Sequence, residues 1–525
     1  MIEMALDVKP DIFTYADFDL EALCRRASAL REGVSCVCDP DQRPCSGSFN
    51  WAIFISFEDG MRWVFRSPHT REFMPMELGM KLLASEAATL RYLRAHSDVP
   101  VPEVYDYCTS SDNDIGIPFI FMSEASGWPL SRVWRPAGSP QPDLDTSRKA
   151  KVLTQLGAIT WKLSQLRLDQ IGSLVEKDGA FEIQECLSRG HVLRGRYDLD
   201  IPRGPFTSAA EFYDSLVSAF SEHAEILQLS HHCFVAPVPS LEDYQSKMQY
   251  RSAVNLWSDF VTIGGKTDSS ENRVDYIIAG DALRDTVPTL QLPAVDRKTF
   301  PLCHADLSVN NIYVDDQYNI TCIIDWAFAS SIPESMLLGA PGLPQYCDEI
   351  SSELLAPFRD GFIAAMPGSI EKELGARYRE SLERSQVSWR LSRLLSLDSI
   401  EDYDLFATVW HSARGPGEDM GEYFLHQRRS ARYAQVYSEV KKEDQPLSKI
   451  EKDENDYFQN KDFRKTIAKK LTLISEWKTQ YTVNSPPILL RSNMFVASPN
   501  LWKWIEQFAQ EWTAMFNMPA TELIS

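Results

Sequence analysis

The segment FPLCHADLSVNNIYVDDQYNITCIIDWAF, residues 300–328, places a histidine and four aspartates around two short apolar runs. The runs, Ile312–Val314 and Ile320–Ile324, flank a polar turn, which predicts a two-stranded hairpin. A loop precedes this hairpin and a carboxylate follows it directly. We therefore expect three polar side chains to meet at one end of the hairpin: Asp306, Asn311 and Asp325.

Two carboxylates and one amide at a strand end can hold a hard cation through oxygen, and one carboxylate then remains to accept a proton. Phosphoryl transfer needs this layout, because a metal bridges the phosphates while a carboxylate orients the attacking hydroxyl. The simpler alternative is turn chemistry, since Asp and Asn favour loops on their own. The hairpin spacing favours catalysis or metal binding over that alternative.

A small sheet is expected upstream. Val34–Cys38, Asn50–Phe57 and Met61–Arg66 are β-rich runs, and an Asp-Gly pair between the last two is a strong hairpin signal. Glu77–His96 has leucines at helical spacing and predicts a helix. Prolines then make residues 99–107 extended, before a last strand at Pro118–Met122.

The rest of the chain is expected to be mostly helical. Residues 152–166 carry a helical apolar stripe, and residues 175–299 are of mixed character, with one good helix at Ala209–Gln228 and polar loops such as GGKTDSSENR. Further amphipathic stretches are predicted near residues 348–365, 369–396 and 399–412. The charged stretch 441–462 is interpreted as a linker in preference to a solvated helix face, and the aromatic tail from Phe463 as a packed segment.

The motifs together resemble those of a known family. HADLSVNN and IIDW resemble the H-x-D-x-x-x-x-N and I-D-W elements of the aminoglycoside phosphotransferase and choline kinase group of kinase-like enzymes. Upstream, GSFN, FEDGMRWVFR and SEAATLRYL look like fungal members of that family. Each motif is weak alone, but their order and spacing are specific. The resemblance covers most of residues 30–430.

This resemblance implies an α+β, two-lobed protein-kinase-like fold, with a small β-sheet plus helix N-lobe and a larger, mostly helical C-lobe. The expected organisation is an N-terminal extension at 1–29, the N-lobe at 30–125 and the C-lobe at 126–435 with an insert at 175–299. A charged linker and an aromatic C-terminal extension at 436–525 complete it.

The resemblance also implies roles at the catalytic end. Asp306 would be the catalytic base, and Asn311 and Asp325 would be the magnesium ligands. His304 would hold the catalytic loop in place by hydrogen bonding, a role close to that of any buried structural histidine.

At the nucleotide end, Gly47 and Ser48 would cover the phosphates with backbone N–H groups, although a lone glycine is nearly as often a simple turn. Arg66 stands where the family usually has lysine, and it would pair with Glu86, which could otherwise be a surface residue. The nucleotide base would meet the backbone of three hinge residues: Ser123, Glu124 and Ala125.

The implied function is Mg-dependent transfer of the γ-phosphoryl group of ATP, or GTP, to a hydroxyl of a small molecule. A small-molecule kinase is favoured over a protein kinase because ASSIPESMLLGAPGLP, not an A-P-E segment, follows Asp325. The alternative is a pseudokinase that serves as a binding or scaffold module. The arginine at position 66 and the single loop glycine favour that alternative, and the intact Asp306, Asn311 and Asp325 oppose it.

Composition limits the partners. The net charge of −21 disfavours nucleic acid and anionic membranes, and makes a cationic or amine-bearing acceptor plausible. The apolar runs are too short to span a membrane, and the N-terminus lacks a signal-like pattern, so we expect a cytoplasmic protein. Cys36, Cys38 and Cys45 are interpreted as free thiols in preference to a metal site. The sequence specifies neither the acceptor nor the oligomeric state.

Overall fold

The computed structural model describes residues 11–69, 74–235, 239, 241–290, 294–399, 401–415, 417–457 and 459. The chain divides into two compact units. The first comprises Met1–Trp134, Leu144–Phe212 and Leu292–Gln386, and the second Arg135–Asp143, Tyr213–Gln291 and Val387–Ser525. Within the described ranges, no helix is long and apolar enough to cross a membrane.

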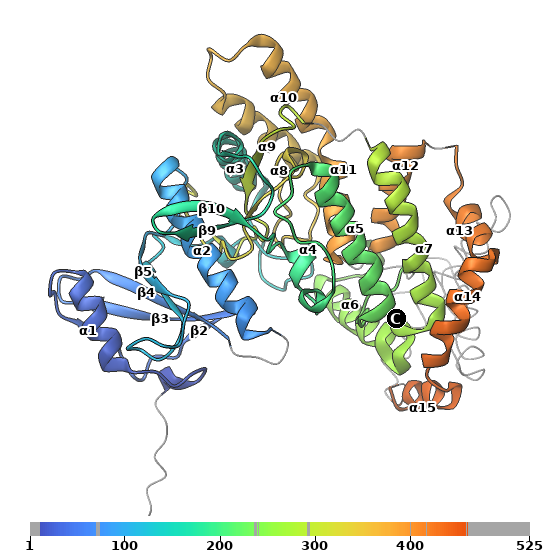
Figure 1. Cartoon of the computed structure of the whole chain (residues 1–525), viewed down its shortest axis with the longest axis horizontal. Coiled ribbons are helices and arrows are strands. Elements are labelled where there is room, and N and C mark those ends of the chain that lie inside the picture. Colours follow the sequence, from blue (N-terminus) through green and yellow to red (C-terminus); the bar gives the residue numbers. More distant parts are fainter. Residues whose placement is uncertain are drawn as a thin grey trace, which may run out of the picture. The chain divides into compact units, whose positions relative to one another are not determined.

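The first unit contains a six-stranded antiparallel sheet in the order β1-β3-β4-β6-β5, with β2 also paired to β3 (Figure 1). The predicted Asp-Gly hairpin is present: Gly60 has φ +85°, and the N–H of Phe57 donates to the carbonyl of Met61 at 2.9 Å. The strands are β1 Cys36–Val37, β2 Cys45–Ser46, β3 Asn50–Phe57, β4 Arg62–Pro68, β5 Val104–Cys108 and β6 Phe119–Ser123.

One face of this sheet forms the core of the small lobe. Alternate residues of β3, including Trp51 and Ile53, are buried there with Phe65 and Phe119. Helix α1, Leu20–Leu30, covers this face, and its N-terminus is capped by the Asp19 side chain, which accepts from Ala22 N–H at 2.8 Å. The described part of the segment expected as an N-terminal extension is therefore packed on the sheet.

Helix α2, Met76–His96, contacts strands β4, β5 and β6 of the same sheet (Figure 1). The leucine stripe that predicted this helix is buried, and Glu86 lies on the buried face with it. The predicted helix at Glu77–His96 is confirmed to within one residue. The buried glutamate matters for the site, because a carboxylate inside a core needs a partner of opposite charge.

The larger lobe begins with helix α3, Thr146–Gln165, which packs closely on α9, Ser352–Ala365. Two glycines allow this approach: a Cβ on Gly157 would lie 2.0 Å from the carbonyl oxygen of Phe358, and one on Gly361 would lie 1.9 Å from that of Thr154. Two other helices of this unit are α8 Glu334–Leu337 and α10 Lys372–Arg384.

Three small sheets follow in the first unit. The predicted hairpin of β12, Ile312–Val314, and β13, Ile320–Ile323, is confirmed, and β7 pairs with β12 on its other edge. Strand β11 lies between β8 and β14, and β9 pairs with β10. The remaining strands are β7 Trp128–Pro129, β8 Arg167–Leu168, β9 Ser173–Lys177, β10 Ala180–Gln184, β11 Phe300–Cys303 and β14 Ser330–Ser331.

The expectation of a single good helix in residues 175–299 is wrong. The structure has α5 Ala209–Ile226, α6 Lys247–Thr262 and α7 Ser270–Thr286. The stretch GGKTDSSENR is not a loop throughout, because α7 begins inside it. Its polar residues are buried donors and acceptors: Asn272 Oδ1 accepts from the N–H of Phe234 at 2.9 Å, and Arg273 donates to the carbonyl of Ala224 at 2.5 Å.

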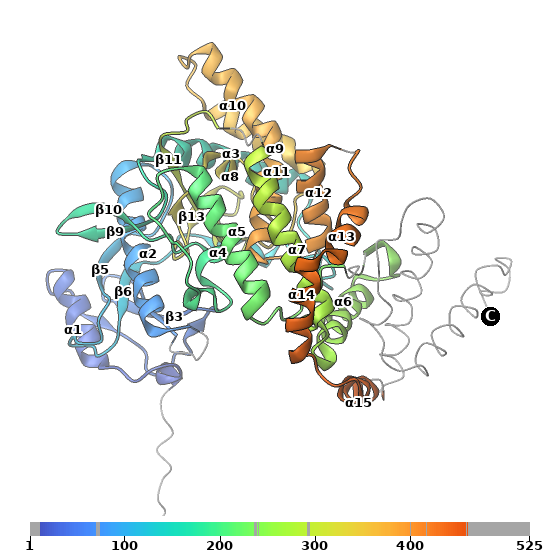
Figure 2. The ribbon, with the colours of Figure 1, turned by 45° about the vertical axis from the view of Figure 1, so that its right-hand side comes forward.

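The second unit is helical, with α7 in contact with α12, α13 and α14 (Figure 2). The interpretation of 441–462 as a linker is wrong for Leu447–Tyr457, which forms helix α15. Glu454 of that helix is buried and pairs with Lys266 at 2.5 Å, so not all charged residues of this helix face solvent. The other helices are α11 Gln386–Ser396, α12 Asp402–Arg414, α13 Met420–Arg429 and α14 Ala431–Val440. The aromatic tail lies outside the described residues.

The expected fold class is confirmed: a small antiparallel sheet with its helix precedes a larger, mostly helical part, as in a two-lobed kinase-like α+β fold. The sheet, α2 and the hairpin of β12 and β13 all belong to the first compact unit. The lobe boundaries predicted from sequence stay predictions.

The contact between α3 and α9 gives a first test. We expect Gly361→Ala to lower the melting temperature by several degrees, because a methyl group cannot fit against the Thr154 carbonyl and overpacking costs about 1–3 kcal/mol. Gly368→Ala is the matched control, since a Cβ there meets nothing within 4 Å. Equal melting temperatures for the two variants in thermal unfolding would contradict the packing.

Candidate active site

The loop predicted to be catalytic begins where β11 ends, at His304. The buried His304 ring is held from both nitrogens: Nε2 lies 2.9 Å from the Ile324 carbonyl oxygen, and Nδ1 accepts from the N–H of Asp306 at 3.2 Å. These partners require a neutral ring with its proton on Nε2. Burial lowers the pKa of His304, which agrees with the neutral form. The histidine thus connects the loop of Asp306 to the strand before Asp325.

Asn311 closes the same loop. Its side-chain Nδ2 donates to the Asp306 carbonyl at 2.8 Å, and its own carbonyl accepts from the N–H of Ile324 at 3.0 Å. Because Nδ2 is engaged, the amide oxygen is the atom that remains for a ligand. These bonds bring the backbones of Asp306 and Asn311 beside Ile324, which precedes Asp325. The predicted meeting of the three side chains stays a prediction.

Asp325 contacts Arg66 of strand β4. Arg66 Nη2 lies 2.5 Å from Asp325 Oδ1, and Arg66 Nη1 lies 3.3 Å from Glu86 Oε1 on α2. The exposed fractions of the Arg66 and Glu86 side chains are 13% and 2%. Asp325 itself has φ +67°, a left-handed conformation that is uncommon for a residue with a Cβ and is often found at functional sites.

The three charges shift one another's pKa values. Burial raises the pKa of Glu86 to about 7, against the opposing charge of Arg66 and with a contribution from Asp325. Burial also acts to raise the pKa of Asp325, but the charge and hydrogen bond of Arg66 outweigh it, so this pKa lies below its ordinary value. Arg66 stays protonated because its two acidic partners outweigh its burial and raise its pKa.

The structure adds one residue that the sequence patterns did not indicate. Arg189 Nη1 lies 3.2 Å from Asp306 Oδ2, and both side chains are mostly buried. Arg189 begins the short helix α4, Arg189–Val192, far upstream of the motif. No local pattern marks it, because the contact exists only once the chain has folded.

The predicted phosphate loop lies between β2 and β3. Gly47 and Ser48 are exposed, and the N–H of Gly47 donates to the carbonyl of Asn50 at 2.9 Å. That bond belongs to a turn, so a phosphate-covering role for Gly47 stays a prediction. The neighbouring Phe49 ring meets Phe328, three residues after Asp325, at 5.2 Å between centroids in an edge-to-face arrangement.

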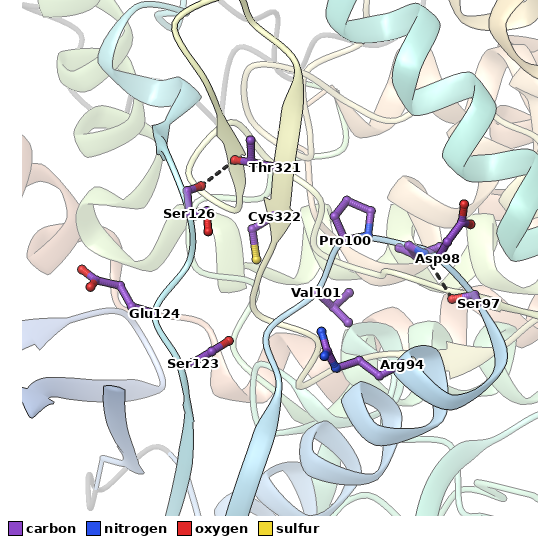
Figure 3. A pocket seen from close by; sticks show the side chains of 11 residues that line it. Arg94, Ser97, Asp98, Pro100, Val101, Ser123, Glu124, Ser126, Thr321 and Cys322 are labelled. Atoms are coloured by element: carbon purple, nitrogen blue, oxygen red, sulfur yellow. Dashed lines mark hydrogen bonds between the residues drawn. The ribbon is translucent and has the colours of Figure 1, made fainter. Parts of the chain in front are cut away.

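A cavity of about 480 Å³ adjoins the predicted hinge (Figure 3). Ser123 and Glu124 line it, whereas Ala125 and the residues of the catalytic loop do not. Thr321 Oγ1 donates to the Ser126 carbonyl at 2.5 Å, which links the hinge to strand β13. The cavity is lined by Arg94, Ser97, Asp98, Val99, Pro100, Val101, Ser123, Glu124, Ser126, Thr321 and Cys322.

The donor set at the loop fits magnesium. Mg²⁺ prefers oxygen ligands and is usually held by one or two protein groups together with substrate phosphates. The Asn311 amide oxygen and the Asp325 carboxylate, one oxygen of which remains beside the bond to Arg66, supply such ligands. In addition, Arg66 Nε is buried with no hydrogen-bond acceptor among the described atoms, as expected where an anionic ligand belongs.

The small sheet and α2 hold the buried pair of Arg66 and Glu86, and Arg66 also contacts Asp325, which follows the hairpin of β12 and β13. This arrangement is that of a two-lobed kinase-like fold. Residues 44–186 match the family model described as "Phosphotransferase enzyme family". This match confirms the family resemblance that the motifs indicated. The matched segment contains Arg66 and Glu86 and ends before His304, so the roles predicted for the loop after His304 stay predictions.

Two relatives are subtelomeric hrmA-associated cluster proteins of Aspergillus fumigatus strains. One is 30% identical over 342 residues, which are 60% of this chain and 62% of the relative. The other is 30% identical over 137 residues, which are 26% of this chain and 25% of the relative. The chain thus spans less than two thirds of the length of either one.

Among solved structures, a macrolide 2'-phosphotransferase from Brachybacterium faecium is 15% identical. The overlay covers 76% of this chain and 100% of that one, with a TM-score of 0.34. At this score the overlay adds nothing to the fold described above.

The raised pKa of Glu86 gives a pH-dependent test. Between pH 4.5 and 7 the folded protein holds a proton on Glu86 that the unfolded chain releases, so this group's contribution to the free energy of unfolding falls as the pH rises through that window. Glu86→Gln removes the effect. We therefore expect the melting temperature of E86Q, relative to wild type, to rise from pH 4.5 to 7.

The measurement is thermal unfolding of both proteins across that pH range, with Glu103→Gln at an exposed position as the control substitution. Groups common to wild type and variant cancel in the difference. Parallel profiles for wild type and E86Q would contradict a buried carboxyl with a raised pKa.

Proposed function

We propose that this chain is a small-molecule kinase that transfers the γ-phosphoryl group of ATP, or GTP, to a hydroxyl of a small acceptor in a magnesium-dependent reaction. The observation that carries this proposal is the contact of Arg66 with both Asp325 and Glu86. It joins a strand and a helix of the small lobe to the end of the hairpin that follows the loop of Asp306 and Asn311. A kinase that uses a nucleotide needs such a connection, because the phosphates must be held between the small lobe and the acidic residues.

Magnesium would be held by Asn311 and Asp325, and when bound it neutralises charge on the phosphates. The chain's own groups supply the remaining functions. Arg66 offers a cationic fork for phosphate oxygens, and Glu86 holds that fork in position. As an arginine, it contacts phosphate with planar geometry instead of the point charge of a lysine. The backbone of Ser123, Glu124 and Ala125 would meet the base.

Asp306 would act on the acceptor. Its carboxylate accepts the hydrogen bond of the attacking hydroxyl and takes the proton as the new oxygen–phosphorus bond forms. His304 does not transfer protons in this scheme, since both ring nitrogens are occupied by the Ile324 carbonyl and the Asp306 N–H. Its task is to keep the Asp306 backbone at a set position relative to the strand before Asp325.

The acceptor is proposed only as a class: a hydroxyl-bearing small molecule. The net charge of −21 supports a cationic or amine-bearing one. The same charge argues against nucleic acid and anionic membrane as partners, and a cytoplasmic location stays a proposal. The family match gives no support to the alternative of a pseudokinase.

Nucleotide binding tests the proposal first. We expect ATP or GTP with magnesium to raise the melting temperature of the wild type, because a ligand that binds only the folded state stabilises it by RT ln(1 + [L]/Kd). Without magnesium the rise should be smaller. Asp325→Asn should lose the magnesium-dependent part, whereas Asp316→Asn, in the turn of the same hairpin, should keep it.

Thermal unfolding with each nucleotide, with and without magnesium, measures these shifts. A wild type that responds to neither nucleotide would reject the kinase function. If it does respond, a screen of hydroxyl acceptors follows, with Asp306→Asn as the inactive control.

A further inference from the structure

Arg189 is held firmly beside the catalytic loop. Its guanidinium carbon lies 4.1 Å from the ring centroid of Tyr346 and 5.6 Å from that of Phe328. Nη1 lies 3.2 Å from Asp306 Oδ2. Two aromatic rings and one carboxylate thus define its position, and cation–π contacts of this kind stabilise a partly buried guanidinium.

Arg189 lies beside both acidic segments of the site. Its Nη1 contacts Asp306, and its guanidinium lies over the ring of Phe328, three residues after Asp325. Two arginines therefore face the acidic groups: Arg66 from the small lobe and Arg189 from helix α4. The four residues between Asp306 and Asn311 include no basic side chain, so the motif itself supplies no cation at this end.

We propose that Arg189 binds the γ-phosphoryl group during transfer, an inference that rests on the proposed kinase function. In that reaction the phosphoryl group must lie between the hydroxyl at Asp306 and the phosphates near Asp325. A guanidinium that contacts the Asp306 carboxylate and lies over the Phe328 ring, three residues after Asp325, is at that place. Its planar fork matches phosphoryl oxygens, and such charge-assisted bonds are among the stronger ones in proteins.

The reaction step balances without an additional reagent. The acceptor oxygen forms a bond to the γ-phosphorus as its proton passes to the Asp306 carboxylate. The bond between the γ-phosphorus and the β–γ bridging oxygen breaks, and the nucleoside diphosphate leaves with that electron pair. Arg189 stays protonated throughout and neutralises charge on the phosphoryl oxygens. Before the nucleotide binds, its ion pair with Asp306 keeps two mostly buried charges compensated.

The test compares a triphosphate with a diphosphate. Titration calorimetry of Mg²⁺ with a non-hydrolysable ATP analogue, and of Mg²⁺ with ADP, gives the affinities of Arg189→Gln and wild type. If wild type prefers guanine, the GTP analogue and GDP replace them. We expect the variant to bind the triphosphate analogue roughly tenfold to hundredfold more weakly, as for the loss of a hydrogen bond to a charged group, and ADP with less than about a twofold change.

The matched control is Arg91→Gln. Arg91 also pairs with a carboxylate, Glu176 at 2.8 Å, and also lies over an aromatic ring, that of Tyr107 at 5.0 Å. We expect it to leave both affinities unchanged. A cooperative thermal unfolding transition of ligand-free Arg189→Gln shows that the variant is folded, even where loss of the ion pair lowers its melting temperature. Arg189→Lys should recover part of the triphosphate affinity.

A double variant separates direct contact from simple neutralisation of Asp306. If Arg189 only cancels the negative charge of Asp306, then Arg189→Gln with Asp306→Asn restores triphosphate binding, and the inference is wrong. If Arg189 contacts the phosphoryl group, the double variant stays weak. Equal loss of both nucleotides, or no loss, also overturns the inference. Failure of the wild type to bind any nucleotide overturns the kinase function itself, and is seen before any variant is made.

Discussion

The buried guanidinium of Arg66 is the interaction on which the arrangement of the site depends. It lies between the carboxylates of Glu86 and Asp325, which come from a helix and from the end of a hairpin. Buried charges are costly unless they are paired, so removing Arg66 would leave two carboxylates without a counter-charge. The two contacts therefore keep β4, α2 and the end of the hairpin at set positions relative to one another.

Arg66 does not pair equally with its two acidic neighbours, Glu86 and Asp325. One guanidinium faces two carboxylates, and the raised pKa of Glu86 together with the lowered pKa of Asp325 shows which acid Arg66 favours. Asp325 is kept ionised in an uncommon backbone conformation, while burial shifts Glu86 towards its protonated form. A carboxylate that stays charged is the one suited to hold a cation. Arg189 provides a similar counter-charge for Asp306.

Short-range patterns predicted the local elements well. The hairpin around Gly60, the helix that carries Glu86 and the pair of strands before Asp325 form where alternation, helical spacing and turn residues indicate. The wrong predictions concern segments that were interpreted as loop or linker because their residues are charged or polar. Asn272 and Glu454 looked like loop or linker residues, yet each is buried against a partner distant in the chain. Composition alone does not distinguish a solvated polar group from a satisfied internal one.

By itself, the sequence determined the hairpin and the loop before it, because the bonds from Asp306 to His304 and from Asn311 to Asp306 join residues close together in the chain. Only the tertiary structure decided which cations meet the two aspartates. Arg189 reaches Asp306 across a long stretch of chain, and such a contact depends on how helices and strands pack, which no local periodicity records.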